Sequence, residues 1–199
     1  MKTIIQIGVA DGNDHVCQLI SSLNYDNVFG IFIEPNIHSI PLIKNIYSNL
    51  QNKIISIIAI SNKTGIVKMY FNNYTTGNSQ QSSVNKEHLY AHGWKDTDID
   101  EIEILSFTLN DYLNKILGFD SNTVIDNLFI DTEGHDCDIL LSTDFSKLNI
   151  KEIYFEIAHT DGAFSGPDTK KLNDCVSYLE THGYKYLNKI ENNYIFKKD

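Results

Sequence analysis

Three side chains that could move a proton or bind a polar substrate lie close together in the segment FIDTEGHD, residues 129–136. His135 is the candidate general base, because an imidazole has an unperturbed pKa of about 6.5 and can accept a proton near neutral pH. We expect Glu133 to orient this imidazole or to bind a hydroxyl group, and Asp131 to lie nearest a bound cofactor. Acids that offset a helix dipole would also explain Glu133, but they explain the adjoining Gly134-His135 less well.

A short turn, GVADG at residues 8–12, follows the first apolar run of the chain. Gly8 and Gly12 allow a ligand to approach the backbone closely at the end of a strand. A dinucleotide site would instead contain G-x-G-x-x-G, whose free amides bind pyrophosphate. Asp11 and Asp14 would repel a pyrophosphate and favour a ligand with an ammonium group and no phosphate, such as S-adenosylmethionine. A plain strand–helix turn with an aspartate cap is the alternative interpretation.

A further acid, Glu34, ends the second apolar run 22 residues after Gly12 and is followed by Pro35. A carboxylate about 20 residues beyond such a turn can accept hydrogen bonds from both ribose hydroxyls of a nucleoside. Nicotinamide cofactors and S-adenosylmethionine share this need, so Glu34 indicates a nucleoside without selecting between them. A solvated acid at a strand end is the simpler alternative.

Glu156 and His159 follow a later apolar run and could line an acceptor pocket or form a buried hydrogen-bonded pair. Together with residues 131, 133 and 135 they are of the types that bind metal ions. Oxygen ligands would suit Mg²⁺, but no spacing among these residues is diagnostic, so we predict no metal. A separate group of side chains could stack on a sugar ring, although packing explains it nearly as well. That group is His88, Tyr90, His92 and Trp94.

The elements that must position these residues alternate between strands and helices. The strands are continuous β-branched runs, which is typical of a parallel sheet covered by helices on both faces. Two final strands flank a short turn and predict an antiparallel hairpin. We expect strands at 3–7, 28–33, 54–60, 127–130, 150–157, 184–190 and 194–197, and helices at 14–23, 38–50, 109–117, 136–141 and from Pro167 to about residue 182.

Residues 65–107 interrupt this alternation, with strands expected at 65–71 and 102–107 and a polar loop at 72–83. The segment is too short to bury a core of its own, so we interpret it as an insertion over the sheet. The chain of 199 residues then forms one α/β domain, residues 1–199.

Several segments together resemble the FkbM family of methyltransferases, over about residues 4 to 159. The matching segments are QIGVADG at 6–12, IEPN at 33–36, AISN at 59–62, QSS at 81–83, TLND at 108–111 and DTEGHD at 131–136. The resemblance implies a Rossmann-like class I methyltransferase fold with a mostly parallel seven-stranded sheet and a C-terminal antiparallel hairpin. It also implies S-adenosylmethionine as cofactor and O-methylation of a sugar, a glycan or a small hydroxylated metabolite.

The expected site residues follow from the resemblance together with the reasoning above. The cofactor would be bound by Gly8, Asp11, Gly12, Glu34, Pro35, Ala59, Ile60 and Ser61; the acceptor by Ser82, Ser83, Glu156 and His159; and catalysis would use Asp131, Glu133 and His135. The chain departs from the family pattern at three positions: Gln6 replaces an acid, Ala10 replaces an asparagine and Asn110 replaces an aspartate. Two alternatives stay open: a nicotinamide-dependent oxidoreductase, and a catalytically silent binding protein on the same fold.

Charge and composition limit the partners. The 26 acidic and 16 basic residues give a formal net charge of −10, which disfavours nucleic acids and anionic membrane surfaces. Three scattered cysteines without a CxxC pair indicate reduced thiols and a cytoplasmic protein. No apolar run approaches the roughly 20 residues that a membrane span needs, and the N-terminal run is broken by Gln6, so we do not expect a signal peptide. The sequence does not specify an oligomeric state.

Overall fold

Parallel strands and helices alternate along the first part of the chain, as the β-branched runs predict. The computed structural model describes residues 1–72, 74–76, 81–159 and 169–198. Three strands pair in parallel, and helices cross between them. These elements are β1 (Lys2–Ile7), α1 (His15–Ser22), β2 (Val28–Ile33), α2 (Ile40–Ile46) and β3 (Lys53–Ser56).

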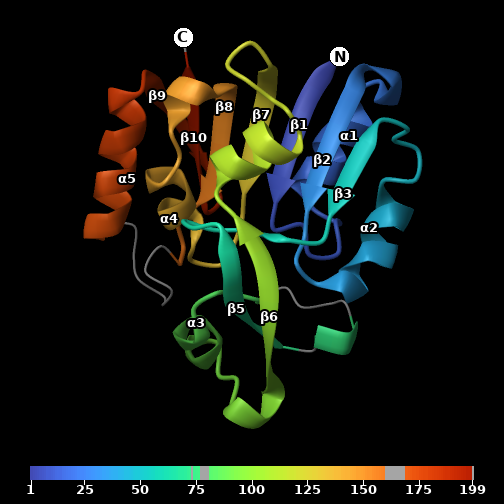
Figure 1. The fold of residues 1–199 in the computed structure, drawn as a ribbon, viewed down its shortest axis with the longest axis vertical. Coiled ribbons are helices and arrows are strands. Elements are labelled where there is room, and N and C mark those ends of the chain that lie inside the picture. The colour runs from blue at the N-terminus through green and yellow to red at the C-terminus, as the bar shows by residue number, and fades with distance from the viewer. Residues whose placement is uncertain (73, 77–80, 160–168, 199) are drawn as a thin grey trace.

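Seven strands form the main sheet, in the order β3-β2-β1-β7-β8-β10-β9 (Figure 1). The last two strands form the predicted hairpin, and β10 runs antiparallel to both β8 and β9. The predicted fold class, a mostly parallel sheet that ends in an antiparallel pair, is therefore confirmed. The remaining strands and helices of this layer are β7 (Val124–Ile130), α4 (Asp136–Leu141), β8 (Asn149–Glu156), α5 (Lys170–Thr181), β9 (Tyr184–Ile190) and β10 (Asn193–Lys198).

Two buried clusters lie on opposite faces of this sheet. On one face, Ile20 of α1 and Ile43 of α2 pack against β1 and β2. On the other, Ile139 of α4 and Leu179 of α5 pack against β7 and β8, together with Leu113 of a short π-helix, η5 (Asp111–Ile116). Helices on both faces bury both sides of each central strand, which explains why those strands are apolar at nearly every position.

A second, smaller sheet extends from the carboxyl edge of the main one (Figure 1). It consists of β4 (Ala59–Ile60), β6 (Ile99–Phe107) and β5 (Gly65–Asn72), with helix α3 (Lys86–Ala91) beside it. The single strand expected at 54–60 is therefore wrong, because the run divides between the two sheets. Ser56 pairs with Ile33, the last residue of β2, so the chain then has no neighbour in the main sheet. Ala59 and Ile60 pair instead with β6.

The other helices differ from expectation mainly in their ends. The helix expected at 109–117 is largely the π-helix η5. Helix α5 begins at Lys170, where the Thr169 side chain accepts a hydrogen bond from Leu172 N; Pro167 lies outside the described residues. Short 3₁₀ turns complete the chain: η1 (Tyr25–Asn27), η2 (Ile37–Ser39), η3 (Tyr74–Thr76), η4 (Asp96–Asp98) and η6 (Phe145–Lys147). No helix in the described ranges is long and apolar enough to cross a membrane, and the three cysteines are free thiols.

The close approach of the ends of the paired strands β1 and β7 generates a stability prediction at Gly8. Gly8 has φ +78°, and a Cβ built on it would lie 1.8 Å from the backbone oxygen of Asp131. Neither the strand nor its neighbour can yield, so Gly8→Ala should lower the free energy of unfolding by about 3 kcal/mol or more. Urea denaturation would measure the change.

Gly118→Ala is the matched control, because Gly118 also has positive φ (+71°) but a Cβ there meets no atom within 4 Å. It should cost only about 1 kcal/mol. Equal losses in the two variants would contradict the close approach of the β1 and β7 ends.

Candidate active site

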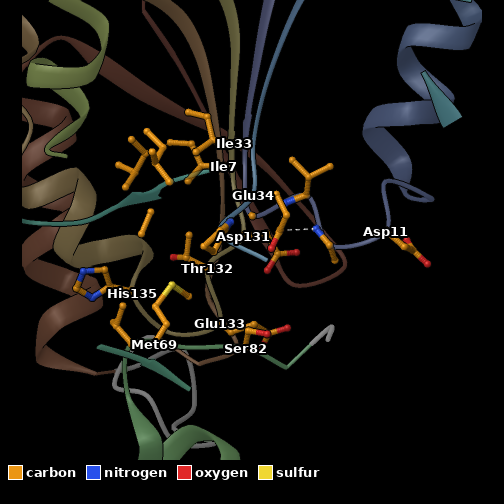
Figure 2. A pocket seen from close by; sticks show the side chains of 18 of the residues that line it. Ile7, Asp11, Ile33, Glu34, Met69, Ser82, Asp131, Thr132, Glu133 and His135 are labelled. Carbon is orange, nitrogen blue, oxygen red and sulfur yellow. Dashed lines mark hydrogen bonds between the residues drawn. The ribbon is translucent and has the colours of Figure 1, made fainter. Parts of the chain in front are cut away.

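A cavity of about 270 Å³ opens at the carboxyl edge of the main sheet, between that sheet and the smaller one (Figure 2). Its walls differ in chemistry. Apolar side chains that include Ile7, Ile33 and Ile60 form one part, and carboxylates form another. Neither lysine nor arginine occurs among its described lining residues. The cavity therefore suits a ligand with an apolar portion and a positive charge.

The predicted cofactor residues divide between the cavity wall and its support. Gly8, Asp11, Glu34, Pro35, Ala59 and Ile60 line the cavity. Gly12 does not: it has φ +81°, and a Cβ there would lie 3.3 Å from the Tyr47 ring. The Asp11 carboxylate accepts a hydrogen bond from Asn13 N and points away from Glu34 and Asp131 (Figure 2). Ser61 is buried behind the wall, with 2% of its surface exposed.

Glu34 connects the turn after β1 to the turn after β2. Its Oε2 accepts hydrogen bonds from Val9 N (3.1 Å) and Ala10 N (2.8 Å), and its Oε1 accepts one from Asn36 N (2.8 Å). A carboxylate offers about four acceptor positions, so one is left on Oε1 for a ligand hydroxyl rather than the two expected. Burial raises the pKa of Glu34 to about 7, although the three backbone hydrogen bonds oppose that rise.

The departure at Gln6 has a local physical reason. Gln6 is buried, and its amide nitrogen donates a hydrogen bond to Oδ2 of Asp14. The other oxygen of Asp14 caps helix α1 by accepting from Val16 N and Cys17 N. An acid at position 6 would place two carboxylates in contact, so Gln6 matches the cap that this chain uses.

Four carboxyl groups lie close together at the acidic part of the site: Asp136 is buried, Glu133 and Glu156 are half-buried, and Asp131 is exposed. Desolvation raises the pKa of each, to about 8 for Glu133 and to about 9 for Glu156. Mutual repulsion adds to the rise at Asp131, which lies near Asp136, Glu133 and Asp14. For Asp136, burial dominates although Thr132 donates hydrogen bonds that lower its pKa. The group therefore favours a positively charged ligand.

His135 lies at the cavity wall between a serine and an aspartate. Its Nε2 is 3.0 Å from Oγ of Ser61, and its Nδ1 is 3.3 Å from Oδ2 of Asp138. Asp138, one turn along α4, also accepts a hydrogen bond from Lys171 (2.9 Å). The orienting acid is thus Asp138, and the expectation that Glu133 would orient His135 is wrong. The i, i+3 spacing on a helix was the sequence signal for this pair.

Glu133 turns instead toward His88 and His159. Its Oε2 lies 3.0 Å from Nε2 of His88 and 3.8 Å from Nε2 of His159. Burial lowers the pKa of both imidazoles to about 4, and that of His92 is also lowered. Sequence reasoning did not connect residues 88 and 133, and only the packing of the two sheets brings them together.

Of the four residues predicted to bind the acceptor, only one lines the cavity. Ser82 lines it. Ser83 is fully buried, and its hydroxyl donates to the backbone oxygen of Glu133 (2.8 Å). Glu156 and His159 lie behind Glu133, outside the cavity lining. Met69 of β5 and Val84, which precedes α3, line the cavity as well, and sequence reasoning named neither.

The sequence model of the methyltransferase FkbM domain matches residues 6–186 of this chain. The chain belongs to the FkbM methyltransferase family. Membership makes S-adenosylmethionine the cofactor of the chain, in agreement with a cavity that has one apolar and one acidic part. The comparison with curated proteins gives no match.

Solved structures share the fold at low sequence identity. An FkbM methyltransferase from Methylobacillus flagellatus superposes with a TM-score of 0.55 at 11% identity, over 98% of this chain and 43% of that one. Fibrillarin from Aeropyrum pernix, in complex with S-adenosyl-L-methionine, gives 0.50 at 9% identity, over 98% and 65%. Fibrillarin from Methanococcus jannaschii gives 0.48 at 12% identity, over 99% and 66%. This FkbM-family chain thus spans only part of the length of each of these proteins.

The contact between Gln6 and Asp14 generates a prediction about the family pattern. Gln6→Glu introduces the acid of that pattern but replaces a hydrogen bond with repulsion between two carboxylates. We expect it to lower the free energy of unfolding by about 2 kcal/mol or more at pH 7. Thermal and urea denaturation would measure this loss.

The Gln6→Glu, Asp14→Asn double variant is the control, because an asparagine at position 14 can donate to the new carboxylate while its oxygen still caps α1. We expect it to recover most of the stability, which a double-mutant cycle would quantify. Additive losses in the two single variants would contradict a direct contact.

Proposed function

We propose that this chain is an S-adenosylmethionine-dependent O-methyltransferase whose acceptor is a hydroxyl group of a sugar, a glycan or a small metabolite. The observation that carries the proposal is the row Asp138–His135–Ser61, in which His135 lines the cavity and the other two residues lie behind its wall. Such a row can remove a proton from an acceptor hydroxyl, which methyl transfer to oxygen requires.

The residues of the cavity fit the cofactor better than they fit a dinucleotide. Ile7, Ile33 and Ile60 can cover an adenine, and Glu34 has one acceptor position for a ribose hydroxyl. The neighbouring carboxyl groups of Asp131, Glu133, Asp136 and Glu156 favour an ammonium and a sulfonium. A pyrophosphate would meet carboxylates without a lysine or arginine among the described lining residues, which argues against the oxidoreductase alternative.

The cofactor supplies a methyl group that its positively charged sulfur already activates. The protein must therefore align the acceptor oxygen and accept its proton. Asp138 is placed to accept a hydrogen bond from Nδ1–H of His135, which leaves the lone pair of Nε2 for the acceptor proton. Ser61 now occupies that lone pair and can either yield to the acceptor hydroxyl or transmit its proton.

The departures at Gln6 and Ala10 do not favour a silent binding protein. Gln6 is explained by the Asp14 cap. Ala10 has φ +49° and contributes its backbone N–H to Glu34, a contact that does not depend on its side chain. Both positions therefore preserve the turn that contacts the cofactor.

Cofactor binding can be tested without knowledge of the acceptor. Calorimetric titration should give micromolar affinity for S-adenosylhomocysteine and no heat with NADH or NADPH. Glu34→Gln should weaken that affinity about tenfold. The glutamine NH₂ group would face backbone N–H groups that now donate to the Glu34 carboxylate, so a donor would meet donors and the turn would lose hydrogen bonds. Glu101→Gln, a change of the same type on an exposed residue of β6, should leave it unchanged. Binding of NADH alone would overturn the cofactor assignment.

Methyl transfer tests the roles of His135 and Asp138. A panel of monosaccharides with tritiated S-adenosylmethionine would identify an acceptor. On that acceptor, His135→Ala should lower kcat by roughly 10²- to 10⁴-fold, and Asp138→Asn by roughly tenfold or more through loss of the oriented tautomer. Affinity for S-adenosylhomocysteine and the acceptor KM should change little.

Asp138→Glu should recover part of the kcat lost in Asp138→Asn, which a purely structural role would not predict. Unchanged kcat in both His135→Ala and Asp138→Asn would exclude this proton path.

A further inference from the structure

Three imidazoles lie together behind Glu133, at the junction of the two sheets. His88 lies in α3 and His92 ends it, so the two share one side of this helix. His159 follows β8 from the other sheet. The ring centroid of His88 lies 4.6 Å from that of His92 and 4.8 Å from that of His159.

Two carboxylates complete the cluster. Oε2 of Glu133 lies 3.0 Å from Nε2 of His88 and 3.8 Å from Nε2 of His159. One ligand atom each from Glu133, Glu156 and His159 lie within 4.8 Å of one another. The same limit holds for His88, His92 and His159. Metal–nitrogen and metal–oxygen bonds are about 2.0–2.2 Å long, so ligand atoms of one ion lie at most about 4.4 Å apart, and small side-chain shifts bring atoms at these separations onto a single ion.

Polar atoms in this cluster have no hydrogen bond to satisfy them. Nδ1 of His88, whose side chain is 1% exposed, and Oε2 of Glu156 are buried without a hydrogen bond to any described residue, and Nε2 of His88 has only its contact with Glu133. Buried polar atoms are normally hydrogen-bonded or bound to a metal ion. His88 and Glu156, which come from elements far apart in the sequence, thus each have an unsatisfied ligand atom in this cluster.

Charge compensation points the same way. Glu133 and Glu156 lie beside the carboxyl groups of Asp131 and Asp136. None of the four pairs with a lysine in the described part of the chain, and the sequence contains no arginine. A divalent cation would compensate two of these acids in their ionised form where the described residues provide no lysine or arginine.

We propose that Glu133, Glu156 and His159 bind a divalent transition-metal ion beside the cofactor cavity, and that the ring of His88, 3.0 Å from Glu133, shifts to supply a fourth ligand. Imidazole nitrogens mixed with carboxylate oxygens favour Zn²⁺, Mn²⁺ or Fe²⁺ over Mg²⁺ and Ca²⁺, which prefer oxygen ligands alone. The sequence led us to predict no metal, because it did not place residue 88 with residues 133, 156 and 159.

His92 lies beside this site and is not counted among its ligands. The amide nitrogen of Gln81 is 3.0 Å from Nδ1 of His92, and Oε1 of Gln81 accepts a hydrogen bond from Trp94 Nε1 (2.6 Å). This arrangement makes Nδ1 an acceptor and leaves the imidazole proton on Nε2. His92 can therefore donate a hydrogen bond to an oxygen bound at the metal.

The site adjoins the place where an acceptor would bind, because Glu133 also lines the cavity (Figure 2). A metal with four protein ligands can bind one or two further oxygens and so orient the hydroxyls of an acceptor. This orienting role rests on the proposed function, whereas metal binding itself does not.

Metal content tests the binding. Chelator-treated protein dialysed against Zn²⁺ or Mn²⁺ should retain one ion per chain by inductively coupled plasma mass spectrometry. Co²⁺ should give the visible absorption of a site with nitrogen and oxygen ligands. His88→Gln and Glu156→Gln should each weaken the affinity by roughly 100-fold, since each removes one of four ligands. His38→Gln and Glu101→Gln change the same residue types outside the cluster and should bind as the unaltered protein does.

Substoichiometric metal in the unaltered protein, or equal affinity in the cluster variants and their controls, would overturn the proposal. Circular dichroism would verify folding; if His88→Gln does not fold, Glu156→Gln decides. Titration of every variant with S-adenosylhomocysteine separates the two proposals. Protein that binds the metal but not S-adenosylhomocysteine would refute the methyltransferase assignment alone. Protein that binds S-adenosylhomocysteine but not the metal would refute the metal site alone.

Discussion

One carboxylate, that of Glu34, defines the edge of the sheet on which the site depends. Its three backbone hydrogen bonds connect the turn after β1 to the turn after β2. A hydrogen bond to a charged group stabilises by about 1.5–3 kcal/mol, so together they offset much of the cost of burying the charge. Because Glu34 also lines the cavity, the same group shapes the turn and forms part of the cavity wall.

The acidic part of the site is the opposite case, because none of its carboxyl groups pairs with a lysine in the described part of the chain. Four neighbouring carboxyl groups have raised pKa values, with desolvation as the largest cause in each. Holding them together costs stability that a ligand of positive charge recovers on binding. The sulfonium and ammonium of the cofactor would meet one side of this group, and the proposed metal ion the other. Both proposals thus follow from a single electrostatic feature.

The sequence predicted the parallel sheet because its signals are local. β-Branched runs, the glycine turn and the terminal hairpin each depend on a few neighbouring residues, and all three are present. The split of the run at 54–60 was not predictable in this way, since it depends on where the neighbouring strand β2 ends.

The site shows the same division between local and non-local information. His135 and Asp138 are one helical turn apart, so their contact could have been anticipated. His88 and Glu133 are separated by 45 residues and belong to different layers. Helix α3 has only six residues, so no apolar periodicity indicated which of its side chains would face the main sheet.

The backbone at Glu133 explains why the smaller sheet is part of the site and not an appendage. Glu133 has φ +54°, a conformation that costs a residue with a side chain roughly 1 kcal/mol or more. Ser83, which pairs with Tyr70 of β5, donates its hydroxyl to the Glu133 carbonyl and helps hold that conformation. The carboxylate is thereby turned toward His88 of α3. Without the β5–β6 segment, Glu133 would lose both the contact that holds it and the imidazole that it faces.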